Sequence, residues 1–554
     1  MPKHRGLIGH TRGDQAAGWI IEEVSEVSES SEGKIAESIG GRGNRDYGRK
    51  SHLMKLKALV GPILLGLSGV AFAPLRLWSA QPEAIPSPLR LLQLVAVMAA
   101  VVIAVVLLLA RIGRPVWPAA ATIMLSGLWF GVSASVVPAS LALLVPLVIW
   151  MLITGALGLL LYRLDNYAVR ALMAALATFV ISQPILGYVL SNPLAIPSDP
   201  GPPSIAVGDN ARSTDLAVVV FDAYNSFTTM ERDLPTKSLE VRDTLIESGF
   251  QVSELAWSPS TRTLISLSAL FDGRLPEQGS DSIEVFVKRM TRSVGGSNRT
   301  FSAFQDAGYV IRYVESGWST TVCGPEVDVC ARRPFVDDSI QAVIDMSLVG
   351  PHLAGGGGHG FGKNALHSLG EVDRALKDMS GNSESELLFA HVVMPHGPYV
   401  VDDQCGSTGQ QIPEGGGSVT ADNHTASEIG YVQQSNCVDL WISRYIESSD
   451  PEMSILFLAD HGSALRLQTT RDPWQWTPDE IRERASVLLA ARTPSECGSL
   501  PTLSTLAAFA WVVGCHLDAD PVVSDNQVVR LYGSDYEPRC VVPLGPDSFK
   551  DVTC

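Results

Sequence analysis

Long apolar stretches dominate the chain between residues 58 and 190 and predict membrane-spanning helices. Each stretch is close to the roughly 20 residues that a helix needs to cross a bilayer. Five of them follow one another, at Ala58–Leu77, Leu91–Leu109, Trp117–Val137, Leu141–Leu161 and Ala168–Leu190. Five consecutive spans exclude a cleaved signal peptide, so we expect a five-span transmembrane anchor over residues 54–190.

Lysine and arginine residues are distributed unevenly around these stretches and predict their orientation. They precede the first stretch and lie in the second-to-third and fourth-to-fifth connections, whereas the loops at 79–88 and 138–140 have none. Because basic loops stay cytoplasmic, we expect the N-terminus in the cytoplasm and the chain after Leu190 outside it. No stretch has a charged residue at its centre, which disfavours a transporter or channel.

Polar segments bound the predicted anchor on both sides. Residues 1–53 are rich in Ser, Glu and Gly without helical periodicity, so we expect a disordered cytoplasmic tail. Residues 191–211 contain repeated Pro, Gly and Ser and predict a linker. The sequence therefore predicts a multi-pass protein of the plasma (inner) membrane with an extracytoplasmic domain at 212–554.

Short apolar runs alternate with helical patterns beyond the linker and predict an α/β domain with a mostly parallel central sheet. The strand-like runs are 216–221, 251–255, 309–314, 387–393, 454–458 and 486–490. The helix-like stretches are 238–248, 263–273, 340–348, 364–377, 428–446 and 502–513. Active residues of such sheets gather at the carboxyl ends of strands, which is where candidate chemistry is expected.

Composition and charge narrow the possible partners. Hydrophobic residues make up 46% of the chain and charged residues only 18%, which fits a chain that lies partly in a membrane. There are 58 acidic against 41 basic side chains, for a net charge of −17. Because this balance would repel phosphate backbones, we expect no nucleic-acid partner.

The cysteines point to an oxidising compartment. All eight lie after residue 322, which predicts disulfides. Pairing of nearest neighbours would give Cys323–Cys330, Cys405–Cys437, Cys497–Cys515 and Cys540–Cys554, although eight cysteines allow 105 connectivities. The alternative is eight reduced thiols in a cytosolic domain. The predicted orientation of the anchor favours the disulfides, because it independently leaves this region outside the cytoplasm.

Carboxylate and imidazole groups directly follow two of the predicted strands. Asp222 ends one apolar run, and Asp460 and His461 end another. Such side chains at strand ends can converge on one divalent cation, since oxygen and imidazole ligands suit zinc, manganese or magnesium. The alternative is that each aspartate only caps the turn that follows it.

A hydroxyl at the start of a predicted helix is the candidate nucleophile. Thr263 begins an apolar helical pattern that Gly273 would end. A helix N-terminus favours an oxyanion or a bound phosphate, although threonine is also an ordinary helix cap. Ser258 and Thr261 remain alternative nucleophiles.

Two histidines and a glycine-rich segment add further candidates. His396 follows a strand between two prolines, so we expect it to be exposed and to bind a substrate oxygen or protonate a leaving group. His391 lies inside the apolar run and is interpreted as structural. Residues 357–364 are close to a phosphate loop, but Asn364 replaces the required Ser or Thr, so we expect a flexible loop there.

Taken in order, the motifs resemble the sulfatase/alkaline-phosphatase superfamily over about residues 212–520. They are Asp222, Thr263, the segment Met394–Tyr399, and Asp460 with His461. The anchor before such a domain is similar to lipoteichoic acid synthases and phosphoethanolamine transferases. This resemblance implies an alkaline-phosphatase-like domain in which Thr263 is the nucleophile and His396 contacts the substrate. It further implies one divalent metal ion held by Asp222, Thr263, Asp460 and His461.

Departures from the sulfatase pattern favour phosphoryl transfer. True sulfatases carry C/S-x-P-x-R, whose first residue becomes formylglycine. Here that residue aligns with Thr263, which cannot be converted, and the arginine position falls on Leu267. The resemblance therefore implies transfer of a phosphoglycerol- or phosphoethanolamine-type group. The donor would be a lipid, the intermediate a covalent threonine ester, and the acceptor an envelope glycan or lipid. A phosphate- or sulfate-ester hydrolase, or a non-catalytic envelope-binding protein, remains the alternative.

Overall fold

The computed structural model of the chain describes segments between residues 59 and 163 and, with short gaps, residues 204–544. Helix α2 (Pro88–Arg111) includes the second predicted stretch, and α3 (Val116–Val132) includes most of the third. Among the described residues, no helix is both long and apolar enough to cross a membrane. The tail, most of the linker, most of the fourth stretch and all of the fifth lie outside the described residues.

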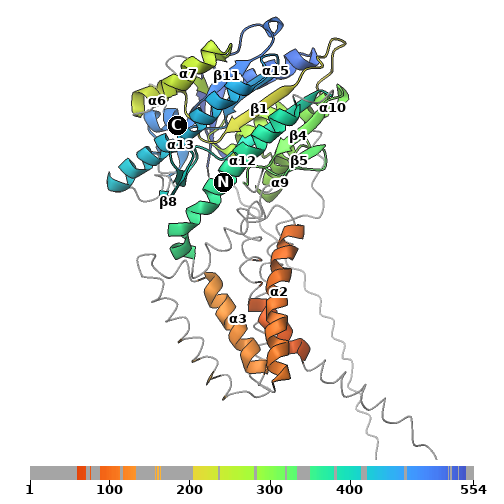
Figure 1. Ribbon diagram of the computed structural model, residues 1–554, viewed down its shortest axis with the longest axis vertical. Coiled ribbons are helices and arrows are strands. Elements are labelled where there is room, and N and C mark those ends of the chain that lie inside the picture. The colour runs from red at the N-terminus through yellow and green to blue at the C-terminus, as the bar shows by residue number, and fades with distance from the viewer. Residues whose placement is uncertain are drawn as a thin grey trace, which may run out of the picture. The chain divides into compact units, whose positions relative to one another are not determined.

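Within the described residues, seven strands form a central sheet in the order β2-β11-β9-β1-β6-β4-β5 (Figure 1). They are β1 Leu216–Phe221, β2 Gln251–Val252, β4 Val310–Val314, β5 Val329–Ala331, β6 Glu386–Val392, β9 Ser454–Ala459 and β11 Leu489–Arg492. The pairs β9–β1, β1–β6, β6–β4 and β4–β5 are parallel, whereas β11 is antiparallel to both of its neighbours. The predicted α/β class with a mostly parallel sheet is confirmed.

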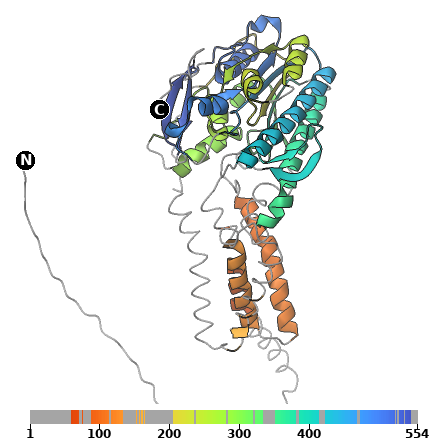
Figure 2. The ribbon, with the colours of Figure 1, turned by 90° about the vertical axis from the view of Figure 1, so that its left-hand side faces the viewer.

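Helices cover both faces of this sheet (Figure 1 and Figure 2). They are α6 Phe227–Asp233, α7 Ser238–Glu247, α8 Thr263–Asp272, α9 Ile283–Val294, α10 Arg299–Asp306, α12 Gly350–Met379, α13 Ala421–Ser448, α14 Pro478–Ala485 and α15 Thr505–Leu517. On one face, Phe221 of β1 contacts the ring of Trp441 in α13. On the other, Phe389 of β6 contacts the ring of Phe271 in α8. This double cover explains why β1, β6 and β9 are buried along their whole length and read as continuous apolar runs.

Short strand pairs lie outside the main sheet, and two predicted strands have other bounds than expected. The pairs are β3 (Ala256–Trp257) with β10 (Ser486–Val487), β7 (Tyr399–Val401) with β8 (Ser407–Ile412), and β12 (Val528–Tyr532) with β13 (Pro538–Pro543). The predicted run 486–490 is broken at Leu488, whose N–H donates to the carbonyl of Tyr224, so β10 and β11 pair with different strands. The predicted run 251–255 contracts to β2, because at the sheet edge it pairs only with Ala490 and Ala491.

The glycine-rich segment 357–364 lies within helix α12, so the predicted flexible loop is wrong. The C-terminal part of α12, which includes the predicted helix 364–377, buries Ala365, Leu369, Val372 and Leu376 at intervals of three or four residues. A buried stripe of this kind fixes a helix through packing, which outweighs the cost of about 1 kcal/mol for each glycine. The predicted helix 340–348 lies outside the described residues.

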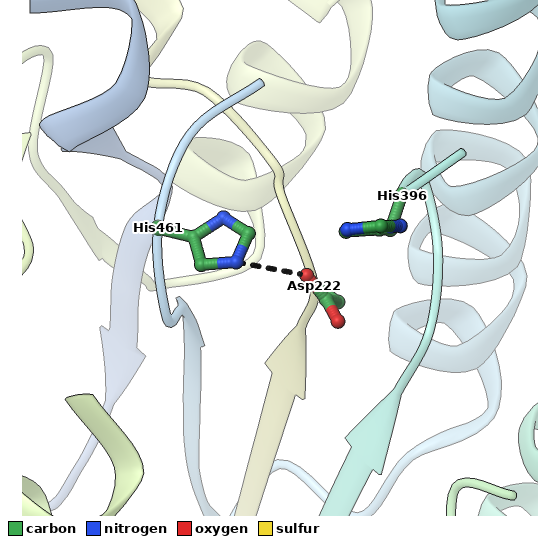
Figure 3. Close-up of side chains that lie close together, drawn as sticks. All are labelled: Asp222, His396 and His461. Atoms are coloured by element: carbon green, nitrogen blue, oxygen red, sulfur yellow. Dashed lines mark ion pairs between the residues drawn. The ribbon is translucent and has the colours of Figure 1, made fainter. Parts of the chain in front are cut away.

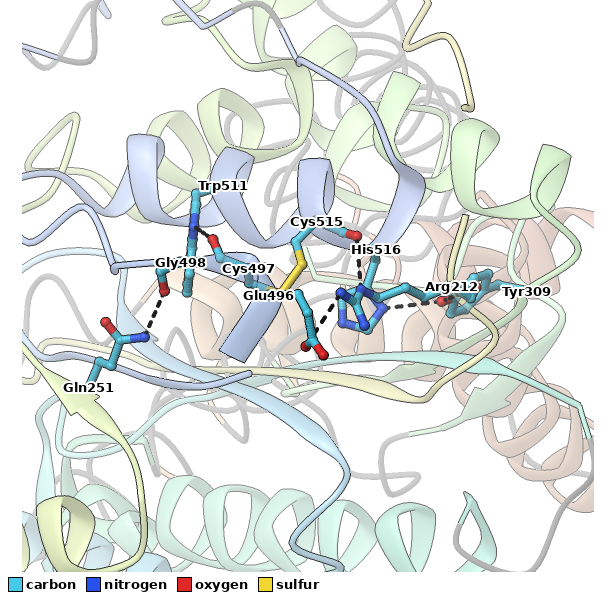
Figure 4. Close-up of a disulfide and its surroundings, with 9 residues drawn as sticks. All are labelled: Arg212, Gln251, Tyr309, Glu496, Cys497, Gly498, Trp511, Cys515 and His516. Atoms are coloured by element: carbon cyan, nitrogen blue, oxygen red, sulfur yellow. Dashed lines mark hydrogen bonds and ion pairs between the residues drawn. A yellow bond between two sulfur atoms is a disulfide. The ribbon is translucent and has the colours of Figure 1, made fainter. Parts of the chain in front are cut away.

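Three disulfides confirm three of the predicted cysteine pairs. They join Cys323 to Cys330, Cys405 to Cys437 and Cys497 to Cys515. The fourth predicted pair involves Cys554, which lies outside the described residues. Figure 4 shows the Cys497–Cys515 bond at α15, where Arg212 donates from Nε to the carbonyl of Cys515 at 3.3 Å. The start of the domain is thus tied to its last long helix.

Candidate active site

Two aspartates lie side by side at the carboxyl edge of the sheet because of the strand register. Strand β1 pairs in parallel with β9 so that their last residues lie opposite each other. The residues that follow, Asp222 and Asp460, therefore reach the edge together, and both side chains are fully buried. The backbone N–H groups of Ala223 and His461 donate to Asp460 Oδ1 at 3.3 and 2.9 Å, which holds this carboxylate in place.

His461 presents an unprotonated nitrogen to this pair of aspartates. Its Nδ1 lies 3.0 Å from the carbonyl oxygen of Gly462, which can only accept, so Nδ1 carries the proton. The lone pair of Nε2 then faces Asp222 Oδ1 at 3.4 Å and Asp460 Oδ2 at 3.5 Å (Figure 3). A carbonyl that fixes the tautomer in this way is typical of histidines that bind metals.

Thr263 is the first residue of α8, and its hydroxyl lies beside His461. As the sequence predicts, the helix ends at Gly273, which adopts φ 65°. Thr263 Oγ1 lies 3.1 Å from His461 Nε2, and because that nitrogen bears the lone pair, the hydroxyl donates. The first turn of a helix has backbone N–H groups without helical partners, and these can stabilise negative charge near the hydroxyl.

The two alternative hydroxyls do not share this placement. Ser258 Oγ donates to the carbonyl of Ser260 at 2.6 Å. Thr261 offers its backbone carbonyl to Nε of Arg484 at 3.3 Å. Of these three hydroxyls, it is that of Thr263 that is hydrogen-bonded to His461.

His396 follows β6 and points toward Asp222 and His461 (Figure 3). One ligand atom from each of the three side chains lies within 4.8 Å of the others. His396 Nδ1 donates to the carbonyl of Gly397 at 2.5 Å, which leaves Nε2 as the atom able to gain or lose a proton. The side chain is half-buried rather than exposed as predicted.

His391, interpreted from the sequence as structural, also lies among these groups. It sits opposite Val220 in the β1–β6 register, and residues two apart along a strand share a face, so it faces the same side as Asp222. Its Nε2 lies 3.5 Å from Asp222 Oδ2 and 3.9 Å from Asp460 Oδ2. In the sequence, the position of His391 close to the end of its strand was the sign that it belongs to the site. That position becomes informative only when the register of β6 against β1 is known.

Arg484 is a site residue that sequence reasoning missed. It lies buried at the end of α14 and donates from Nη1 to the carbonyl of Gly462 at 2.9 Å and from Nε to that of Thr261 at 3.3 Å. Its Nη2 lies 3.3 Å from His461 Nε2. Arg484 thus joins the segment before Thr263 to the segment after His461. No local pattern marks it, because its neighbours come from two distant parts of the chain.

Burial dominates the electrostatics of the site. It raises the pKa of Asp460 to about 7, and the negative charge of Asp222 adds to the rise. Burial also lowers the pKa of His391 to about 4, and it lowers the pKa of His461 well below its usual value, with a further contribution from Arg484. The imidazoles are therefore neutral while two carboxylates face each other, and a cation between them would relieve both effects.

The residues present fit a divalent metal. Zinc is bound by imidazole nitrogen and carboxylate oxygen at about 2.0–2.2 Å, which in a tetrahedron separates the ligand atoms by about 3.3–3.6 Å. His461 Nε2 lies 3.4 Å from Asp222 Oδ1, 3.5 Å from Asp460 Oδ2 and 3.1 Å from Thr263 Oγ1. One oxygen of each of the other three side chains that the sequence predicted as metal ligands therefore lies within 3.1–3.5 Å of His461 Nε2.

Comparison with known proteins gives matches among solved structures alone. No family model and no curated protein matches the chain. Matched structures include the C-terminal periplasmic domain of EptC from Escherichia coli, at 11% identity and TM-score 0.38, covering 62% of this chain and 96% of that domain. Lipooligosaccharide phosphoethanolamine transferase A from Neisseria meningitidis, an integral membrane protein, matches at 15% identity and TM-score 0.36, covering 85% and 96%.

A 2-O GAG sulfatase matches at 12% identity and TM-score 0.33, covering 55% of this chain and 71% of its own. The matches thus include both phosphoethanolamine transferases and sulfatases, the kinds of protein that the motifs resemble.

Proposed function

We propose that this chain is a membrane-bound, metal-dependent enzyme that transfers a phospho-group through a covalent intermediate on Thr263. The observation that carries the proposal is the hydrogen bond of 3.1 Å from the Thr263 hydroxyl to His461, at the start of a helix and beside two buried aspartates. A nucleophile, a cation site and the N-terminus of a helix meet there. This combination suits attack on a phosphate ester.

The chain's own residues account for holding and activating the nucleophile. Asp222, Asp460 and His461, with Thr263 itself, would hold one divalent ion. Such an ion, when bound, lowers the pKa of a coordinated hydroxyl and offsets the charge of phosphoryl oxygens. Arg484 fixes the loops on either side through the carbonyls of Thr261 and Gly462. The first turn of α8 adds backbone N–H groups where charge develops.

The reaction proceeds in two displacements. The Thr263 hydroxyl would first lose its proton to water, and His396 would start with protons on both ring nitrogens. In the first displacement, Thr263 Oγ1 bonds to phosphorus of a phosphodiester head group, and the bond from phosphorus to the lipid oxygen breaks. His396 gives the proton on Nε2 to that departing oxygen. In the second, an acceptor hydroxyl loses its proton to His396 and bonds to phosphorus, which releases Thr263. Each proton that leaves His396 in the first step is thus regained in the second.

The substrate class follows from the nucleophile and from the anchor that the sequence predicts. A threonine ester suits phosphoryl transfer, because threonine cannot become the formylglycine that sulfatases use. A five-span anchor at 54–190 would hold the domain beside lipid donors and raise their effective concentration. We therefore propose a phosphoglycerol- or phosphoethanolamine-type lipid donor, and an envelope glycan or lipid as acceptor, on the extracytoplasmic side of the inner membrane.

The predicted compartment has its own test. Three disulfides among the described residues support a location outside the cytoplasm. We expect a thiol-alkylating reagent to label no more than the two cysteines of the remaining pair in unreduced protein from cells. Labelling of all eight cysteines would contradict the extracytoplasmic location.

Intact mass spectrometry tests the reaction. The full chain in detergent is incubated with manganese and a membrane lipid extract, alongside Thr263→Ala and the control Thr300→Ala. Thr300 is a matched control because it is buried and its hydroxyl donates to the carbonyl of Phe271, at the opposite end of α8 from Thr263. We expect an adduct on wild type and on Thr300→Ala but not on Thr263→Ala. An adduct that survives in Thr263→Ala would overturn the assignment.

The same experiment separates the alternatives. Release of the free phospho-group into water, with no acceptor product, would make the enzyme a hydrolase. Absence of both adduct and turnover with phosphate and sulfate esters would favour an envelope-binding protein.

A further inference from the structure

The turn that follows β1 has a strained residue directly after Asp222. Ala223 adopts φ 67° and is fully buried. In this left-handed conformation the Cβ atom comes too close to the backbone, so glycine adopts it readily and alanine does not. A residue in such a conformation persists only where the surrounding structure holds it. The contacts of this turn must therefore keep Ala223 in place.

The peptide group between Asp222 and Ala223 is bound on both sides by residues of the site. The carbonyl oxygen of Asp222 accepts from the backbone N–H of His396 at 3.0 Å. The N–H of Ala223 donates to Oδ1 of Asp460 at 3.3 Å. The φ angle of Ala223 sets how this peptide group is turned relative to the rest of the loop. The left-handed conformation therefore sets the direction of Asp222 and of both hydrogen bonds.

Tyr431, in α13, holds the other side of the turn. Its hydroxyl donates to the carbonyl oxygen of Ala223 at 2.9 Å and accepts from the backbone N–H of Asn225 at 3.0 Å. The side chain is 0% exposed, and its ring packs edge-on against that of Tyr399. One buried hydroxyl thus joins the two peptide groups that come directly after Ala223.

We propose that Tyr431 is a positioning residue of the metal site, whose hydroxyl keeps Ala223 in the conformation that aims Asp222 at the cation. The inference rests on the proposed function, because Asp222 is a ligand of the proposed ion. Tyr431 acts on the ion through the turn, as groups that orient metal ligands do. Without the hydroxyl, Ala223 relaxes to a negative φ and the carboxylate of Asp222 turns away from His461.

Manganese affinity of the full chain in detergent tests this role. Protein stripped of metal with a chelator is titrated with Mn²⁺, and free manganese is followed by electron paramagnetic resonance. We expect Tyr431→Phe to lower the affinity by about 10-fold, as loss of a group that orients a metal ligand does. Affinity equal to that of wild type would overturn the inference.

Tyr445→Phe is the matched control for this measurement. Tyr445 lies buried in the same helix, and its hydroxyl contacts Met453 Sδ at 3.4 Å. The variant should bind manganese as wild type does. An equal loss of affinity in Tyr445→Phe and Tyr431→Phe would mean that any change in the core of α13 disturbs the site, and would overturn the specific role of Tyr431.

A double variant separates positioning from simple loss of a hydrogen bond. Glycine adopts φ 67° at little steric cost, so the turn of Ala223→Gly no longer needs Tyr431 to hold it. We therefore expect Tyr431→Phe to lower manganese affinity much less in the Ala223→Gly background than in the wild-type background. An equal loss in the two backgrounds would mean that strain at Ala223 plays no part, and would overturn the inference.

Urea unfolding of the metal-free protein gives a second measurement, which needs no change at Tyr431. Ala223→Gly should unfold at a urea concentration at or above that of wild type, because glycine relieves the strain. Ala508→Gly, at a buried position inside α15, should unfold at a lower concentration. A lower midpoint in both variants would show that Ala223 is not strained and would contradict the inference.

The outcomes separate this inference from the proposed function. Manganese binding that is the same in wild type and Tyr431→Phe would remove the positioning role and keep the metal site. Loss of affinity in Tyr431→Phe that Ala223→Gly suppresses, without any adduct on Thr263, would support the positioning role and contradict the proposed reaction. No manganese binding in wild type would contradict both.

Discussion

Two buried polar clusters lie close together along the same two loops, yet the distances between their polar atoms differ. The first is the metal-ligand cluster of Asp222, Thr263, His391, Asp460 and His461. The second, here called the Asn225 cluster, contains Asn225, Tyr431, Ser463 and Glu483. Each has members just after β1 and β9, within four residues of the strand ends.

The Asn225 cluster is joined by ordinary hydrogen bonds. Asn225 Nδ2 donates to the carbonyl of Glu483 at 2.5 Å, and its Oδ1 accepts from the N–H of Ser463 at 3.1 Å and from the hydroxyl of Tyr431 at 2.9 Å. The Glu483 carboxylate accepts from the Ser463 hydroxyl at 2.8 Å. Donors and acceptors alternate, as expected of a group that holds a fold together.

In the metal-ligand cluster, by contrast, carboxylate oxygens face imidazole nitrogens at 3.4–3.9 Å. All four exceed the lengths of good hydrogen bonds, and the three at 3.4–3.5 Å match the separations of ligand atoms around a zinc ion. The comparison teaches that burial alone does not identify a site. The Asn225 cluster fixes the two loops through hydrogen bonds. The spacing of the oxygens and nitrogens in the metal-ligand cluster suits the proposed cation instead.

Thr263→Ala should have the largest effect, because it removes the proposed nucleophile. We expect turnover of a lipid phosphodiester to fall by about 10³-fold or more, with the fold retained and the metal held by the three remaining ligands. Steady-state kinetics on wild type, Thr263→Ala and Ser258→Ala make the test, and Ser258→Ala should stay near wild type. Loss of turnover in Ser258→Ala alone would transfer the role to Ser258.

Asp460→Asn should separate metal binding from stability. We expect affinity for Mn²⁺ to fall by about 100-fold or more, since a charged ligand is lost. Stability of the metal-free protein should not fall, because the amide removes a buried charge that faces Asp222. Metal titration and urea unfolding measure the two effects, with Asp439→Asn as the buried control that keeps the metal. Unchanged affinity in Asp460→Asn would contradict the metal site.

Asn225→Ala should give the opposite pattern. It leaves the Ser463 N–H and the Glu483 carbonyl without their partner, so we expect the free energy of unfolding to fall by about 2 kcal/mol. Affinity for Mn²⁺ should fall less than in Asp460→Asn. Metal loss without a change in stability would show that the two clusters are not distinct.

Asp439 should give a smaller, pH-dependent effect. Burial raises its pKa to about 7 in the folded protein, although the hydroxyl of Tyr224 donates to it and lowers the pKa in part. Between about pH 4 and 7 the folded state keeps a proton that the unfolded chain releases, so stability falls as pH rises through this window.

In Asp439→Asn this decline should shrink by about 2–3 kcal/mol between pH 5 and 8. Urea unfolding at both pH values, in metal-free protein, measures the difference between the variant and wild type. Equal pH dependence in the two proteins would mean that Asp439 is ionised throughout.

Strand-end chemistry could be predicted from the sequence because it is local. The run 216–221 coincides with β1, and Asp222, Asp460 and His461 follow buried strands directly. The ends of parallel strands meet at one edge, so their convergence needed no further information. The start of α8 at Thr263 and its end at Gly273 were likewise local patterns.

Features that depend on register or on distant packing could not be predicted. His391 joins the site because β6 pairs with β1 in one particular register, and a slip of one residue would turn it to the other face. Arg484 joins through two loops far from it in sequence. The helical state of 357–364 runs against glycine propensity and reflects packing of the rest of α12.

Anomalous diffraction at the zinc edge, from crystals of the full chain grown with zinc, tests the metal-ligand cluster most directly. We expect a peak bound by His461 Nε2 and the carboxylates of Asp222 and Asp460, at about 2.0–2.2 Å from each ligand atom. Thr263 Oγ1 should be the next atom in contact. A fully occupied zinc elsewhere, with these side chains unliganded, would contradict the account.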